Sequence, residues 1–225
     1  MIDTGPAKIT GHVKIYDPES GEIFYDDHNA INYENISVAM AQTLSDRNLG
    51  YIYQMAFGNG GSSVDPTGVI TYLPPNTTGQ NASLYNQTYQ KVVNDNSAAD
   101  TDPDNNKMTV LHTAGNVYSD ILVSCLLDYG EPAQQQAFDN STNFNGEFVF
   151  DELGLKVWNG AVDNLRLITH VIFHPVQKSL NRQIQIDYTL RIQTLSNISV
   201  VSGASGGGSS SGGGGGSSSG GGSGY

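Results

Sequence analysis

Cysteine is almost absent from this sequence, with Cys125 the only one among 225 residues. No disulfide can therefore form within the chain, and no zinc site can be built from cysteine ligands. Cys125 lies in the apolar run ILVSCLLDY, where a thiol usually packs as a small buried hydrophobe. We expect Cys125 to belong to the core rather than to a reactive site.

Basic side chains are also scarce. Ten Lys and Arg stand against 22 Asp and Glu, which gives a net charge of −12. Such a chain repels nucleic acid and anionic membranes. No apolar run is long enough to cross a bilayer. We therefore expect neither nucleic acid nor a membrane as a partner.

Motifs for catalysis are missing as well. The sequence contains no G-x-S-x-G elbow for a nucleophilic serine. Two pairs of adjacent carboxylates occur, Asp26–Asp27 and Asp151–Glu152, but neighbouring residues on a strand are expected to face opposite ways. We predict a protein that is not an enzyme, with no catalytic residues.

The glycine-rich stretch MAFGNGG (55–61) raises the question of a phosphate loop. Such a loop needs its glycines to lead into a helix, usually with a lysine in reach. Here GNGGSSVDPTG runs into a further turn, and the first lysine after it is Lys91. We predict that the glycines turn the end of a strand or allow close approach of another backbone segment, and that no nucleotide cofactor binds.

The acidic loop 95–104 contains three aspartates with the alternate spacing of a calcium loop, Asp100, Asp102 and Asp104. The pattern then breaks, because the sixth position is Asn105 and the twelfth is Leu111 instead of Gly and Glu. A solvated loop is favoured over a calcium site.

Two histidines, His170 and His174, are four residues apart in an apparent strand and so share a face. Zinc would need a third ligand from elsewhere, such as His112 or a carboxylate. The sequence shows no such partner nearby, so we predict structural histidines and no metal site.

Most of the remaining sequence is typical of strands. Residues 8–16 alternate with Ile9, Val13 and Ile15 on one face, and 22–26 return as the second strand of a hairpin. The clearest alternation is QIQIDYTLRI at 183–192. These patterns predict a mainly β fold, an antiparallel β-sandwich or barrel-like domain.

One short N-terminal helix is predicted in NYENISVAMAQTLSDRN, with Asn32 or Asn35 as its cap and Gly50 closing it. Its apolar face would hold four residues, Ile36, Ala39, Met40 and Leu44.

The chain divides into a β-rich domain at 1–201 and a Gly/Ser-rich tail at 202–225. Within the domain, 58–107 is polar and rich in turn residues, and a loop region of this length usually carries function or contacts a neighbour. The tail lacks charge and apolar surface, so alone it is expected to be a flexible coil that only other chains can order.

Five short stretches, read in order, resemble a group of bacteriophage virion proteins, the tail-fibre, collar or baseplate-associated modules. They are HNAI (28–31), IYQMAFGNGG (52–61), FVFDELGL (148–155), LRLITHVIFHPVQKS (165–179) and IQIDYTLRI (184–192). Their order carries the resemblance, since each piece alone is short.

The resemblance implies a structural component of a tailed-phage virion that forms homo-oligomers and contacts other virion proteins. It would be assembled in the host cytoplasm and located in the virion. A capsid decoration protein or head fibre is one alternative. The other is a receptor-binding module that binds host surface glycan through three tyrosines expected to be exposed, Tyr72, Tyr85 and Tyr89.

Overall fold

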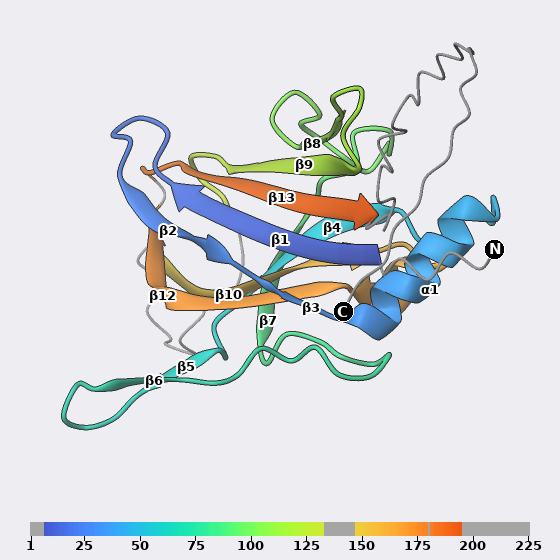
Figure 1. The fold of residues 1–225 in the computed structure, drawn as a ribbon. Coiled ribbons are helices and arrows are strands. Elements are labelled where there is room, and N and C mark those ends of the chain that lie inside the picture. The colour runs from blue at the N-terminus through green and yellow to red at the C-terminus, as the bar shows by residue number, and fades with distance from the viewer. Residues whose placement is uncertain (1–6, 133–146, 180, 195–225) are drawn as a thin grey trace, which may run out of the picture.

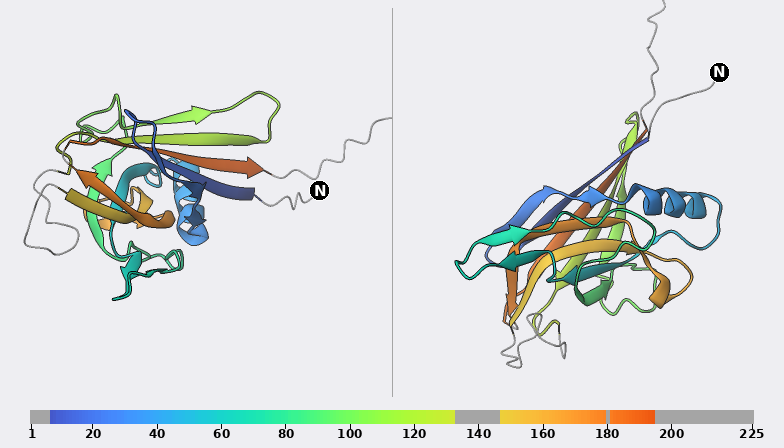
Figure 2. Two further views of the ribbon diagram at one scale, coloured as in Figure 1. Left: turned by 90° about the vertical axis from the view of Figure 1, so that its left-hand side faces the viewer. Right: turned by 90° about the horizontal axis from the view of Figure 1, so that it is seen from below.

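The computed structural model describes residues 7–132, 147–179 and 181–194. Within them, two antiparallel sheets pack face to face, and the single α-helix of the described residues lies at one end of the sandwich (Figures 1 and 2). The predicted mainly β, antiparallel fold with one N-terminal helix is therefore confirmed. The tail at 202–225 lies outside the described residues, and the division at residue 201 stays a prediction.

The first sheet has the strand order β2-β1-β13-β9-β8. Its strands are β1 (Ala7–Tyr16), β2 (Ile23–His28), β8 (Lys107–Leu111), β9 (Tyr118–Leu127) and β13 (Ile184–Thr194). The alternation predicted for β1 and β13 is confirmed, because every second residue is buried from Ile9 to Ile15 and from Ile184 to Leu190. Pairing of β1 with β13 runs the whole length of both strands, from Ala7 opposite Thr194 to Tyr16 opposite Gln185.

The second sheet has the order β3-β12-β10-β4-β7. Its strands are β3 (Ala30–Ile31), β4 (Ile52–Gly58), β7 (Gln87–Val92), β10 (Glu147–Val157) and β12 (Thr169–Ser179), with β11 (Arg166–Leu167) paired to the end of β10. A short 3-10 helix, Val162–Asn164, precedes β11, and β5 (Ser62–Val64) pairs with β6 (Ile70–Tyr72) as a separate hairpin. All seven residues of β4 are buried, so β4 is enclosed on both faces.

The chain passes from one sheet to the other at Asn29, between β2 and β3 (Figure 1). The Asn29 side chain lies directly against Gly11 of β1, at a place where any Cβ would overlap it. Its amide donates a hydrogen bond to the hydroxyl of Tyr188, a fully buried residue of β13. This contact fixes the crossing point against the centre of the first sheet.

Helix α1 spans Tyr33–Leu44, and Asn32 is its N-cap, with Oδ1 accepting from the N–H of Asn35 at 3.0 Å. Ile36 and Ala39 face the core as predicted. Two predictions for α1 are wrong. Leu44 does not face the core but is 84% exposed, and the helix ends at Leu44 with Ser45 as its C-cap, well before Gly50.

The region 58–107 contains strands as well as loops, and the Tyr- and Val-containing stretch SLYNQTYQKVV (83–93), which is typical of a strand or an extended arm, holds β7. The region also holds the β5–β6 hairpin, and β7 adds to the edge of the second sheet beside β4. Much of this region therefore packs on its own domain. In the described residues, no helix is long and apolar enough to cross a membrane.

Candidate functional site

The glycine turn after β4 is held by carboxylates of the same chain. The N–H of Gly60 donates to Glu152 Oε1 at 3.0 Å, and the N–H of Gly61 donates to Asp151 Oδ1 at 3.0 Å. The N–H and hydroxyl of Ser62 both donate to Asp151 Oδ2. Three successive amides that could have bound a phosphate are therefore occupied. The glycines are needed for close approach, because a Cβ on Gly60 would lie 2.7 Å from the backbone nitrogen of Asn86.

The two adjacent carboxylates do not face opposite sides of β10, which corrects the expectation from simple alternation. The pairing of β10 with β12 shifts register between Phe150 and Glu152. Such a bulge re-aims side chains, and both Asp151 and Glu152 reach the glycine turn. Both residues are buried, with 3% and 0% exposure.

Glu152 also connects the turn to the segment before β7 and to β12. Its carboxylate accepts from the N–H groups of Tyr85 and Asn86, at 2.9 and 2.8 Å, and from His170 Nε2 at 2.9 Å. The N–H of Asn76 donates to His170 Nδ1 at 2.8 Å, so Nδ1 carries no proton and the neutral ring donates through Nε2. We call Asp151, Glu152, His170 and the turn 58–62 the carboxylate network.

The two carboxyl groups differ in acidity. Burial disfavours the charge of Glu152, but the hydrogen bonds from His170 and the three backbone N–H groups outweigh it and lower its pKa. Burial raises the pKa of Asp151 above its usual value in spite of the donors from Ser62 and Gly61. The side chains of Asp151, Glu152 and His170 are buried, and they pair with donors and acceptors of the same chain, so these contacts hold the surrounding loops together.

The histidines that were considered as metal ligands make separate contacts. His174 Nδ1 lies 3.2 Å from the hydroxyl of Tyr72, and His112 Nδ1 contacts the Tyr118 carbonyl and the Ser119 hydroxyl. Among the residues that the structure describes, no group of three or more His, Cys, Asp or Glu is placed to hold a metal ion.

The acidic loop forms local turns. Asp100 Oδ1 accepts the N–H of Asp102, and both carboxylate oxygens of Asp102 accept from the Asn105 amide, at 3.1 and 3.0 Å. Asp104 is exposed. Both carboxylate oxygens of Asp102 therefore accept hydrogen bonds from within the loop.

The three tyrosines differ in exposure. Tyr72 and Tyr85 are 47% and 43% exposed, as expected. Tyr89 is half-buried and packs against Phe57 with ring centroids 5.9 Å apart, so the prediction that it is exposed is wrong. The reason is that β7 joins the second sheet, which turns Tyr89 toward the core.

A second cluster of buried charge lies near the ends of β7, β9 and β12. Lys91 Nζ contacts Glu131 and the carbonyl of Leu126, and Lys178 Nζ donates to the carbonyls of Asp128 and Ser179 at 3.0 and 2.8 Å. Burial lowers the pKa of Lys178 to about 8. Cys125 is fully buried as predicted, and burial raises its thiol pKa to about 12, so it is an unreactive core residue.

An apolar groove of about 670 Å³ opens between α1 and the first sheet. Residues of α1, β8, β9 and β13 provide most of its walls, among them Ile36, Met40, Met108, Val110, Ile121 and Ile192. No Asp, Glu, Lys or Arg of the described residues lines it. Val110 and Leu44 on its rim are 70% and 84% exposed. We call this feature the apolar groove.

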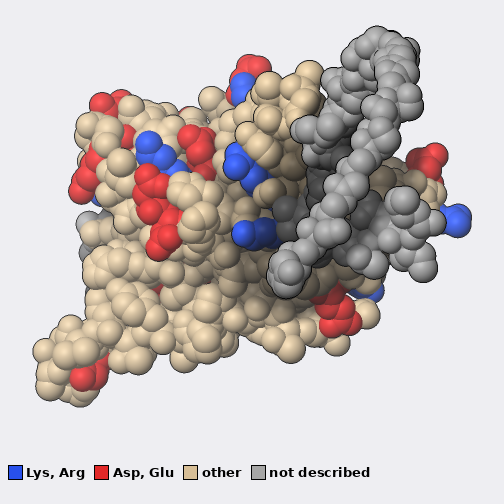
Figure 3. Space-filling model, in the orientation of Figure 1, with Lys and Arg blue, Asp and Glu red and all other residues tan. Residues whose placement is uncertain are grey.

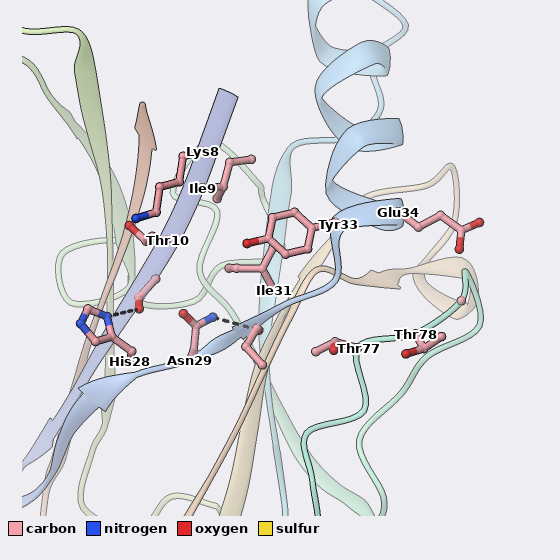
Figure 4. Close-up of a pocket in the computed structure, with 13 residues that line it drawn as sticks. Lys8, Ile9, Thr10, His28, Asn29, Ile31, Tyr33, Glu34, Thr77 and Thr78 are labelled. Carbon is pink, nitrogen blue, oxygen red and sulfur yellow. Dashed lines mark hydrogen bonds between the residues drawn. The ribbon is translucent and has the colours of Figure 1, made fainter. Parts of the chain in front are cut away.

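A polar cleft of about 770 Å³ lies on the other side of β1 (Figure 4). Lys8 and Thr10 of β1 form one wall, and the first turn of α1 with Thr77 and Thr78 forms the other, while His28 and Asn29 lie between them. Tyr33 at this site is 64% exposed. We call it the polar cleft.

Neither depression was predicted from the sequence. The apolar groove combines segments from residue 9 to residue 194, and only their pairing and packing in the folded domain bring them together. The sequence feature that could have indicated the groove was the apolar face of α1. This face extends to Leu44, which the core does not cover.

The described residues thus define an antiparallel two-sheet β protein with a closed carboxylate network and two open depressions. Comparison with models of known protein families, with curated proteins and with solved structures finds no match for this chain.

Proposed function

We propose that this protein is a non-enzymatic structural component of a tailed-phage virion, in the tail, collar or baseplate region, and that it acts through contacts between subunits. The observation that supports subunit contact is the apolar groove, because its exposed rim is unfavourable in water unless another surface covers it. The phage assignment depends on the ordered stretches between residues 28 and 192 that resemble virion modules.

The rest of the described surface agrees with this role. Charged atoms form scattered spots on a face that is otherwise uncharged (Figure 3). Such a surface limits repulsion between copies at close contact. The paired side chains of Glu152 and His170 are fully buried and form hydrogen bonds with loops of their own chain.

Self-association tests the proposal. The purified protein should form oligomers in sedimentation velocity, and Val110→Asp on the groove rim should shift it toward monomer. Val64→Asp is the matched control, since Val64 is 62% exposed on β5, away from the groove (Figure 1). A wild-type protein that stays monomeric at every concentration contradicts the proposal.

Location in the particle tests the phage assignment separately. Antibody against the protein should label the tail, collar or baseplate of intact particles. Labelling of the capsid would identify a decoration protein or head fibre instead, and the absence of the protein from purified particles would contradict a virion role.

The polar cleft favours a second candidate function, binding of host surface glycan. Glycan sites combine an exposed aromatic ring with side chains that hydrogen-bond hydroxyl groups, and here Tyr33 lies beside Glu34 and Thr77. Binding to a glycan array should be lost in Tyr33→Ala and kept in Tyr72→Ala, a change outside the cleft. Loss in Tyr72→Ala alone would place the site on the β5–β6 hairpin instead.

A further inference from the structure

The apolar groove is an unusual feature for an acidic chain. Its walls contain no Asp, Glu, Lys or Arg of the described residues, although the whole chain has a net charge of −12. Its volume of about 670 Å³ is in the range that encloses a small ligand or several aliphatic side chains. Whatever fills it must be uncharged, because a buried charge without a partner is costly.

We propose that the groove binds residues 195–201, LSNISVV, of a neighbouring copy of the same chain. This inference rests on the proposed function, self-association through the groove, and names the segment that each copy contributes. The groove would therefore bind a short, uncharged peptide that is rich in aliphatic side chains.

Composition selects this segment over the other parts of the chain outside the described residues. Four of its seven residues are aliphatic, and none is charged. Residues 1–6, MIDTGP, carry the charged Asp3. Residues 202–225 contain only Ala204 and Tyr225 among Gly and Ser. Residues 133–146 carry Asp139 and are otherwise mostly polar. Of these segments, 195–201 best matches apolar walls without Asp, Glu, Lys or Arg.

The point where the chain leaves β13 also supports the choice. Thr194, the last described residue, lines the groove itself, and its N–H and hydroxyl both donate to the carbonyl of Val117, at 2.9 and 3.1 Å. The segment therefore begins at the mouth of a groove in every copy. Where two copies meet at this end of the sandwich, each presents both an empty groove and a segment.

Length favours the neighbour's groove over the chain's own. Thr194 is still hydrogen-bonded to Val117. For the segment to enter the groove of its own chain, the chain would therefore have to reverse direction after Thr194. A four-residue turn over 194–197 would then leave only 198–201 to fill the groove. In a neighbour's groove all seven residues can lie extended, about 23 Å at roughly 3.3 Å per residue. In this arrangement Leu195 can also pack into the neighbour's groove.

Cross-linking between copies tests the proposal directly. Full-length protein carrying Val110→Cys is mixed with full-length protein carrying Ile198→Cys under mild oxidation. The native Cys125 is fully buried and does not compete. A covalent dimer containing one copy of each variant should form at least about tenfold faster than with the matched tail variant Ser210→Cys, because docking raises the effective concentration.

Charge substitution supplies a second measurement. Ile198→Asp together with Val200→Asp should weaken self-association at least about tenfold, equivalent to roughly 1.4 kcal/mol. Ser210→Asp, which adds charge in the tail, should leave it unchanged. Far-UV circular dichroism should be identical for all variants, because the substitutions lie beyond β13.

The outcomes separate this inference from the proposed function. If the wild type assembles but neither the cross-link nor the charge substitutions have an effect, the segment is wrong and subunit assembly stands. If a single chain carrying both Val110→Cys and Ile198→Cys cross-links only within itself, the segment fills its own groove and the inference is overturned. A wild type that is always monomeric contradicts both.

Discussion

Glu152 shows how one residue can organise several loops. It has no exposed atoms, yet its carboxylate accepts hydrogen bonds from the N–H groups of Gly60, Tyr85 and Asn86 and from His170. These contacts join the end of β4, the start of β7 and the start of β12. The charge of Glu152 is stabilised entirely by donors of its own chain.

Glu152→Gln should therefore lower the free energy of unfolding by about 2–4 kcal/mol, because charge-assisted hydrogen bonds are lost and an amide NH₂ group then faces other donors. Urea unfolding measures the change. The control Glu34→Gln removes the same charge from an exposed position in the first turn of α1 and should change stability by less than about 1 kcal/mol. Equal effects of the two substitutions would show that Glu152 does not hold the loops.

Lys178 gives a prediction of pH dependence. Burial lowers its folded-state pKa to about 8 from the ordinary lysine value of 10.5. Between these two pH values the unfolded chain holds a proton that the folded chain has released, so stability rises with pH, by at most about 1.4 kcal/mol per pH unit. Lys178 should thus add to the free energy of unfolding between about pH 8 and about pH 9.5, while Cys125, whose thiol pKa burial raises to about 12 in the folded state, acts in the opposite direction.

Lys178→Met isolates this effect, because methionine has a similar unbranched side chain and does not titrate. The stability of the variant should rise less steeply with pH than that of the wild type over the same interval. Parallel curves for the two proteins would mean that Lys178 titrates alike in the folded and unfolded states.

At the scale of elements, helix α1 depends on its N-cap residue, Asn32. Asn32 is fully buried, caps the helix through Oδ1, and donates from Nδ2 to the carbonyl of Gly79 at 2.9 Å. Asn32→Ala should lower stability by about 1–3 kcal/mol, since both a cap and a buried hydrogen bond are lost. Asn81→Ala, at an exposed position, is the matched control. Thermal unfolding compares the two, and equal midpoints would contradict this role for the cap.

The elements themselves were largely predictable, because local alternation determines which face of a strand is buried. Ile9, Val13 and Ile15 of β1 lie in the core as their spacing predicts. The end of α1 was not predictable, because Asp46 and Asn48 adopt positive φ and stop the helix before Gly50. The alternation of apolar residues does not predict where the helix ends. It also does not predict the register shift between Phe150 and Glu152, which brings the carboxylates of Asp151 and Glu152 to the same glycine turn.

At the scale of the molecule, the depressions could not be predicted because they depend on pairing between distant segments. The apolar groove joins α1 to strands that begin 70 and more residues later in the chain. Its lining residues look like ordinary core residues in their own strands. Only the exposed rim, with Val110 and Leu44, shows that one end of the sandwich is left open.

The net charge of the chain predicts how assembly responds to salt. Each copy carries −12, so copies repel each other, and the range of that repulsion falls from about 30 Å at 0.01 M salt to about 10 Å at 0.1 M. The described residues that line the groove carry no Asp, Glu, Lys or Arg, so contact through the groove has no ion pair there to lose when salt is added. Self-association should therefore tighten across this interval, measured by sedimentation equilibrium.

Val110→Asp sharpens the same measurement, because it places a carboxylate on the groove rim of each copy. Its association should be weaker than that of the wild type at low salt and should recover only in part at high salt, since screening reduces repulsion between copies but does not remove the cost of burying the new charge. If salt instead weakens the association of the wild type, ion pairs hold the copies together, and the contact lies on a charged surface outside the groove.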